Sequence, residues 1–198
     1  MNPRKKAKTA PQNYQWAELL DLARKESAPK TGVQVGRPTR SFPSKDLPLR
    51  IAESDYLLIE NELLPKLIGI EKLTLSLMFS FFLNFSSHNL DGFNPPDEHP
   101  WSRMVEIYKK EIATQKASGP GRPVSPYTRR LHLMIPTDDF VMINELAEKL
   151  AKDIKYKNSL IARFVLRRAA EECSEIVPGS ITTFVELADY LFQRSAKM

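Results

Sequence analysis

In the segment 131–135, Leu-His-Leu-Met-Ile, the residues Leu, Leu and Ile recur at alternate positions. The same alternation is present in 47–51, Leu-Pro-Leu-Arg-Ile, which lies 84 residues earlier. Successive side chains of a β-strand point to opposite faces, so each segment predicts a short strand with one apolar face. One short strand alone has nothing to pair with. We therefore expect the two segments to pair antiparallel within the same chain.

The two regions agree far beyond these strands, and a Gly-Arg-Pro triplet precedes each of them, at 36–38 and 121–123. Polar, charged, aromatic and apolar types coincide at an offset of 84, and of 83 after one inserted residue. This agreement indicates an internal repeat. The aligned residues after the strands are Asp55, Tyr56, Ile59, Asn61, Glu62, Leu63, Lys66, Leu67, Lys72, Ser76, Leu77, Phe81 and Leu83 in the first copy, and Asp139, Phe140, Ile143, Asn144, Glu145, Leu146, Lys149, Leu150, Lys155, Ser159, Leu160, Phe164 and Leu166 in the second.

Each strand is followed by two stretches with apolar residues at helical spacing, which predicts two helices per copy. In the second copy, Thr137, Asp138 and Asp139 suit a helix N-terminus, where a hydroxyl caps free N–H groups and carboxylates face the helix dipole. The next helix is expected at about 158–172. Its outer side is expected to carry Arg163, Arg167 and Arg168 as a solvated or salt-bridged face, with a DNA-contacting surface as the alternative. The predicted fold is mainly α with a short two-stranded antiparallel ribbon, in which the two repeats form a pseudo-dimer within one chain, with extra helices and extended arms.

The chain divides into five parts by composition and periodicity. They are a basic arm with a short helix and the first Gly-Arg-Pro connector (1–45), the first repeat (46–85), a loop, linker helix and second connector (86–128), the second repeat (129–175), and a C-terminal amphipathic helix (176–198). The last helix suits packing or self-association, or the binding of a protein partner.

Positive charge is concentrated near the N-terminus. The 198 residues carry a net charge of +5, whereas 1–45 alone hold ten Lys/Arg and three Asp/Glu. A basic arm favours contact with a polyanion, and a solvated tail is the alternative. The lone Cys173 excludes a disulfide framework within the chain and suggests a reducing, cytoplasmic compartment. No metal or other cofactor is indicated, because the three histidines lie apart without ligands at metal-binding spacing.

The only membrane candidate is the apolar run 73–85, Leu-Thr-Leu-Ser-Leu-Met-Phe-Ser-Phe-Phe-Leu-Asn-Phe. A spanning helix needs about 20 apolar residues, so this run predicts a buried core helix. No membrane contact is expected.

The repeated pattern resembles the ribbon-helix-helix family of DNA-binding proteins, the class that includes the Met and Arc repressors, here in tandem over 46–85 and 130–172. The resemblance implies that a two-stranded ribbon enters the major groove, that outward strand residues read bases, and that the N-terminus of each second helix holds a phosphate. The implied base-reading residues are Asp46, Pro48 and Arg50 in one copy and Arg130, His132 and Met134 in the other. The implied phosphate contacts are Lys72 and Thr74, and Lys155, Lys157 and Asn158.

The chain departs from the family pattern at several points. The usual small Gly/Ser turn before the second helix is absent from the second copy, so the phosphate contact there would rest on lysines. Pro65 stands where the second copy has Glu148 and should end or kink its helix early. Pro48 lacks an N–H group and fits only where the ribbon needs no donor. The first copy would then contribute Arg50 alone to reading.

The Gly-Arg-Pro triplets resemble AT-hook cores, in which an arginine lies in a narrow A·T-rich minor groove. The resemblance implies minor-groove contact by Arg37, Arg40 and Arg122, although the arginine that commonly precedes the glycine is missing. The alternative is a plain Gly/Pro connector.

The sequence therefore predicts a double-stranded DNA-binding protein that is not an enzyme, most simply a transcriptional regulator. The family resemblance implies a prokaryotic, plasmid or viral origin. An accessory protein of plasmid transfer, partition or transposition is one alternative. Another is the DNA-binding part of an antitoxin, with the terminal helix binding a toxin. No phosphate loop, paired-carboxylate site or nucleophile with histidine is evident.

Overall fold

The computed structural model describes residues 15–26, 43–89, 110, 129–151 and 156–195. In chain order its elements are α1 (Gln15–Glu26), β1 (Ser44–Ile51), α2 (Glu53–Leu58), the π-helical turn η1 (Ile59–Leu63), α3 (Leu64–Lys66), α4 (Leu75–Asn89), β2 (Arg129–Pro136), α6 (Thr137–Ala151), α7 (Lys157–Glu172) and α8 (Phe184–Ser195). This part of the chain is mainly helical with one two-stranded antiparallel sheet, which confirms the predicted mainly α class with a short ribbon.

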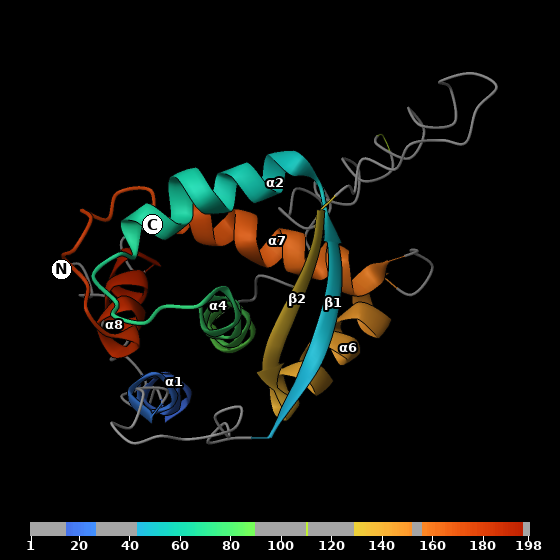
Figure 1. Ribbon diagram of the computed structural model, residues 1–198, viewed down its shortest axis with the longest axis horizontal. Helices are drawn as coiled ribbons and strands as arrows, with labels where there is room; N and C mark the ends of the chain where they lie inside the picture. The colour runs from blue at the N-terminus through green and yellow to red at the C-terminus, as the bar shows by residue number, and fades with distance from the viewer. Residues whose placement is uncertain (1–14, 27–42, 90–109, 111–128, 152–155, 196–198) are drawn as a thin grey trace, which may run out of the picture.

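The strands β1 and β2 pair antiparallel with each other, as the alternation predicts (Figure 1). The register places Pro48 opposite His132, and Leu47 opposite Leu133. Residues 48 and 132 are also related by the offset of 84. The ribbon is therefore centred on two residues that the sequence alignment makes equivalent.

In each half of the chain, the last helix of the half packs against the strand of the other half. α4, which follows the helical run α2–η1–α3 after β1, contacts β2, whereas α7, which follows α6 after β2, contacts β1. α4 and α7 also pack against each other. Each strand is thus supported by a helix that belongs to the other half of the chain, so neither half could form this core alone.

The helical run after β1 contains one wide turn, η1, at Ile59–Leu63. Its counterpart after β2, α6, is α-helical throughout Thr137–Ala151. A π-turn takes up one extra residue while the helix continues. It lies where the offset between the copies changes from 84 to 83, and it ends two residues before Pro65. The predicted disturbance near this proline takes the form of a π-turn followed by the short helix α3.

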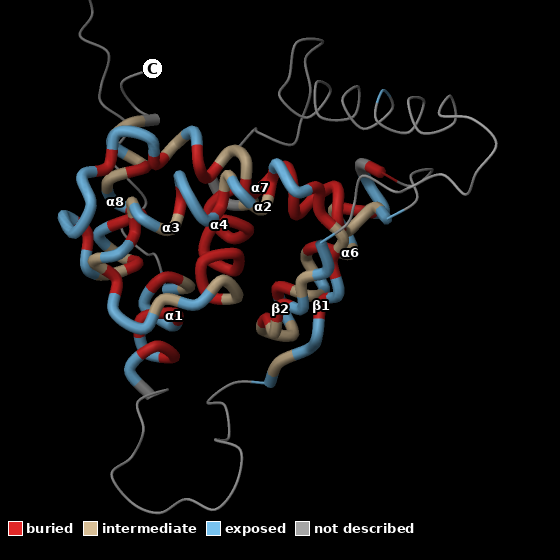
Figure 2. The backbone as a smooth tube through the Cα atoms, turned by 45° about the horizontal axis from the view of Figure 1, so that its top comes forward, coloured by how far each residue is buried: buried red, intermediate tan, exposed pale blue. Residues whose placement is uncertain are grey.

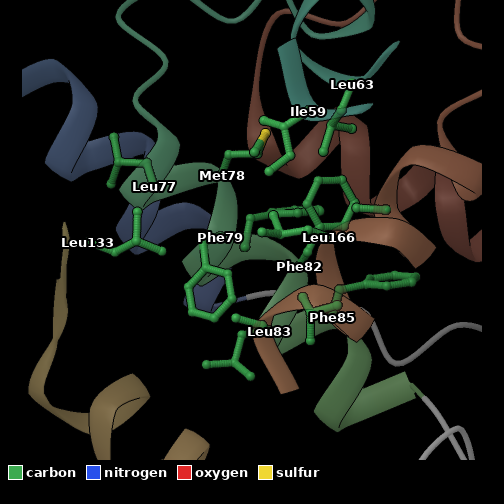
Figure 3. Packing of buried hydrophobic residues seen from close by; sticks show 14 of the residues in the cluster. Ile59, Leu63, Leu77, Met78, Phe79, Phe82, Leu83, Phe85, Leu133 and Leu166 are labelled. Atoms are coloured by element: carbon green, nitrogen blue, oxygen red, sulfur yellow. The ribbon is translucent and has the colours of Figure 1, made fainter. Parts of the chain in front are cut away.

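The core is built around α4. The ring of Phe81 lies 5.1 Å from that of Trp16 in α1 and 5.2 Å from that of Phe184 in α8. Figure 3 shows apolar side chains of α4 beside Leu133 of β2 and Leu166 of α7, all of them buried. The apolar run that was the membrane candidate is therefore a core helix. Among the helices that the structure describes, none has the length and apolar character needed to cross a membrane.

Hydrogen bonds connect α1 to the start of α8. The carboxylate of Asp21 accepts hydrogen bonds from the N–H groups of Phe184 (3.0 Å) and Val185 (3.2 Å), which caps the start of α8. Arg24 donates to the carbonyl of Thr182 at 2.7 Å. The apolar side of α8 is buried against α1 and α4. Its buried residues are Phe184, Leu187, Ala188 and Leu191. The C-terminal helix thus uses this face for packing within the chain.

One prediction about α7 is wrong. Arg163 was expected on the solvated side, but its side chain is 1% exposed and pairs with the carboxylate of Asp55. Arg167 donates to the other oxygen of the same carboxylate at 2.5 Å. Arg168, by contrast, forms a partly buried salt bridge with Glu172, one turn further along α7. A buried guanidinium is retained here because a buried carboxylate faces it.

Candidate nucleic-acid interface

The six predicted base-reading residues share the outward face of the ribbon. They form three opposed pairs: Asp46 with Met134, Pro48 with His132, and Arg50 with Arg130. Asp46, Pro48, Arg130 and His132 are exposed, and Arg50 and Met134 are half-buried. The opposite face carries buried leucines and isoleucines, and Figure 2 shows both strands alternating between buried and more exposed positions.

Two contacts orient side chains on the outward face. Nδ1 of His132 lies 3.0 Å from Oδ2 of Asp46, so the middle and one outer pair of the ribbon are linked. The guanidinium of Arg50 lies over the ring of Tyr156, 5.2 Å from its centroid. Tyr156 has φ 62°, in the left-handed region, directly before α7. Local periodicity does not predict this contact of Tyr156, because the contact depends on that turn.

Serine hydroxyls hold the two outer edges of the ribbon. Ser159 Oγ accepts a hydrogen bond from the N–H of Arg50 at 2.9 Å, and Ser76 Oγ accepts one from the N–H of Met134 at 3.0 Å. N–H groups two residues apart on a strand point to the same edge. Pro48 therefore stands where the β1–β2 ladder needs no donor, as expected. The two serines also place the first turns of α4 and α7 beside the strands.

A cation covers an aromatic ring at each end of the ribbon. Lys45 Nζ lies 5.1 Å from the ring centroid of Phe140, and the guanidinium of Arg129 lies 4.7 Å from that of Tyr56. Lys45 and Arg129 are related by the offset of 84, as are Tyr56 and Phe140. Such contacts are electrostatically favourable. In each case the strand of one half covers the helix of the other.

Arg129 is further held by the carboxylate of Glu53, to which Nε (2.7 Å) and one terminal nitrogen (2.9 Å) both donate. These hydrogen bonds are the main reason that the pKa of Glu53 is lowered and that of Arg129 is raised. The guanidinium of Arg129 is thus paired, whereas Arg130 has no hydrogen bond or ion pair with another residue in the described part of the chain. The two neighbouring arginines differ in their freedom to bind a new partner.

Four of the predicted phosphate-binding residues belong to the described part of the chain, and they lie at or just before the N-termini of α4 and α7. Thr74 Oγ1 accepts a hydrogen bond from the N–H of Leu77 at 3.2 Å, so it caps α4. Lys72 is exposed, with φ 53°. In the second half, Lys157 pairs with Glu148, and the side-chain nitrogen of Asn158 donates to Asn144 at 2.9 Å.

Four predicted contacts lie outside the described residues: Lys155, Arg37, Arg40 and Arg122. Within the described ranges, no group of three or more His, Cys, Asp or Glu side chains is arranged to hold a metal ion. The candidate interface is therefore a surface of cationic and polar side chains, without a metal centre in that part of the protein.

We compared the chain with models of protein families, with curated proteins and with solved structures, and no significant match was found in any of the three.

Proposed function

We propose that the protein binds double-stranded DNA sequence-specifically through the β1–β2 ribbon, and that its two strand–helix–helix halves are tandem ribbon-helix-helix repeats forming a pseudo-dimer. A transcriptional regulator is the role we favour. The observation that carries the proposal is the register of the ribbon. It centres the pairing on Pro48 and His132 and turns all six predicted reading residues to one face.

Matched contacts support the pseudo-dimer. The hydrogen bonds of Ser76 and Ser159 to the opposite strands join positions that the alignment makes equivalent. So do the cation–ring contacts at the two ends of the ribbon. In a third set, Asn84 donates to Asp139 at 2.8 Å and Arg167 donates to Asp55. Arg167 is equivalent to Asn84 at an offset of 83, and Asp139 is equivalent to Asp55 at an offset of 84. Three independent pairs of contacts follow the same relation between the halves.

The chemistry of the outward face supports DNA as the ligand. A two-stranded ribbon fits the major groove, which is about 12 Å wide. Arg50 and Arg130 can donate to base edges, and the exposed Lys72 lies near the start of a helix, where phosphates are favourably bound.

The test uses the full chain and DNA fragments enriched by it from a random-sequence duplex pool. Arg130→Ala should weaken binding of the enriched duplex by about 1–3 kcal/mol, whereas Lys66→Ala, which removes an equal charge from α3 outside the basic arm, should have little effect. Affinity should also fall steeply with salt concentration. Equal behaviour of the two variants would mean that the ribbon does not read DNA, and failure to enrich any sequence would contradict sequence-specific binding.

A further inference from the structure

The outward face of the ribbon has two chemically different ends. In β1 the outward positions run from Asp46 early in the strand to Arg50 late in it, and in β2 they run from Arg130 to Met134. The antiparallel register then brings Arg50 opposite Arg130 and Asp46 opposite Met134. Both arginines therefore lie at one end, which we name the arginine end, and the carboxylate lies at the other, the acidic end.

Neighbouring residues reinforce this difference. At the arginine end, the ring of Tyr156 lies beneath the guanidinium of Arg50 and restricts its position. At the acidic end, Asp46 lies within hydrogen-bonding distance of His132, at 3.0 Å, which draws its carboxylate toward the middle of the ribbon. Met134, half-buried beside it, offers an apolar surface.

The two ends suit different base edges. Guanine presents two acceptors in the major groove, N7 and O6, which match an arginine guanidinium. A carboxylate is repelled by those acceptors and instead accepts from the amino group of cytosine, while an apolar side chain suits the methyl group of thymine. A ribbon turned end for end would therefore place Asp46 over guanine acceptors and leave the arginines without them.

We propose that the ribbon binds a non-palindromic DNA site in a single orientation, with guanines under the arginine end and cytosine or thymine under the acidic end. This inference rests on the proposed function. It adds that the DNA site is non-palindromic and that the ribbon binds it in one orientation. Each good bidentate contact discriminates against a wrong base by roughly tenfold or more, so the reversed complex should be a minor species.

Two exposed positions allow the orientation to be measured. Ser54 follows β1 beyond the arginine end, and Asp138 follows β2 beyond the acidic end. They are related by the offset of 84 and are therefore a matched pair. Cys173 is fully buried, and burial raises the pKa of its thiol to about 12. A thiol-reactive iron chelate should consequently attach to an introduced cysteine rather than to Cys173.

The experiment enriches bound duplexes from a random pool with the full chain, then maps cleavage of the enriched duplex by iron chelate attached to Ser54→Cys or to Asp138→Cys. We expect a non-palindromic motif, with the first variant cutting the flank beside the guanines and the second cutting the opposite flank. Arg50→Ala combined with Arg130→Ala should lose roughly tenfold or more in preference for those guanines.

The outcomes separate the two proposals. If both variants cut both flanks equally, or if the enriched motif is palindromic, DNA binding stands and the single orientation is overturned. If the first variant cuts the flank away from the guanines, the assignment of the two ends is overturned. If no motif is enriched and no cleavage exceeds that of the unsubstituted chain, the proposed function fails, and the orientation with it.

Discussion

Ser159 Oγ, in the first turn of α7, accepts a hydrogen bond from the backbone N–H of Arg50 at 2.9 Å and so closes an edge of the ribbon that no third strand covers among the described elements. Removing the hydroxyl would leave a backbone donor without its acceptor. We expect Ser159→Ala to lower the free energy of unfolding by about 1–3 kcal/mol, and Ser76→Ala, which acts on Met134 in the same way, to have an effect of similar size.

Chemical denaturation followed by circular dichroism measures both changes. Ser54→Ala is the matched control, because Ser54 is exposed and its loss should shift stability by less than about 0.5 kcal/mol. If all three variants unfolded at the same denaturant concentration, the two serine contacts would contribute nothing to the ribbon.

Asp55 provides a second prediction. Its buried carboxylate accepts from both Arg163 and Arg167, and Arg163 is 1% exposed. Asp55→Asn keeps the shape of the side chain but leaves a buried guanidinium without its counter-charge. Stability should fall by about 3–5 kcal/mol. Asp138→Asn, at an exposed position in the first turn of α6, should cost far less in the same denaturation experiment. A loss below about 1 kcal/mol for Asp55→Asn would show that Arg163 is stabilised by other groups.

The π-turn η1 gives a third prediction. Deleting Glu60 would turn Ile59–Leu63 into an ordinary α-turn, but Pro65 would then stand inside an α-helix. The ring would clash with a carbonyl of the preceding turn and cost about 3 kcal/mol. Deleting Glu60 together with Pro65→Glu, the residue type at the aligned position 148, removes that conflict.

Thermal or chemical unfolding should therefore show the single deletion to be destabilised and the combined variant to be largely restored. The control is deletion of Glu145 from α6, a helix that has no wide turn. This deletion would rotate the buried Ala147 and Ala151 out of the core. If the combined variant were as unstable as this control, the π-turn would be required for more than the fit of one extra residue.

Cys173 offers a prediction about reactivity and pH. Burial, the largest effect, raises its thiol pKa to about 12, so the reactive thiolate is nearly absent at neutral pH. We expect the folded chain not to react with a chromogenic aromatic disulfide at pH 8. One thiol per chain should react after unfolding in denaturant. Rapid reaction of the folded chain would mean that the region around α7 and α8 opens readily.

The ribbon could be predicted from the sequence because its information is local. Alternation identifies the two strands and predicts that they pair, whereas the centre of the pairing at Pro48 and His132 comes from the observed register. The outward face follows from the same alternation. The sequence alone did not reveal that both arginines would lie at one end, because that depends on the observed register.

Arg163 and Asp21 could not be assigned for a different reason. The spacing of arginines along α7 does not say that a buried carboxylate, Asp55, lies opposite one of them, more than a hundred residues away in sequence. The cap that Asp21 supplies to α8 likewise joins the two ends of the chain. Such contacts arise from tertiary packing, so the local periodicity of the sequence does not predict them.

Because both strands of the ribbon belong to one polypeptide, the partner strand is present at a fixed effective concentration, set by the length of chain between them. Dilution cannot separate the strands, so a single molecule carries the complete outward face of the ribbon. The two strands are also free to differ, since a change in one is not copied into the other as it would be in a symmetric dimer. The proposed DNA contact would therefore require one copy of the chain and not the association of two.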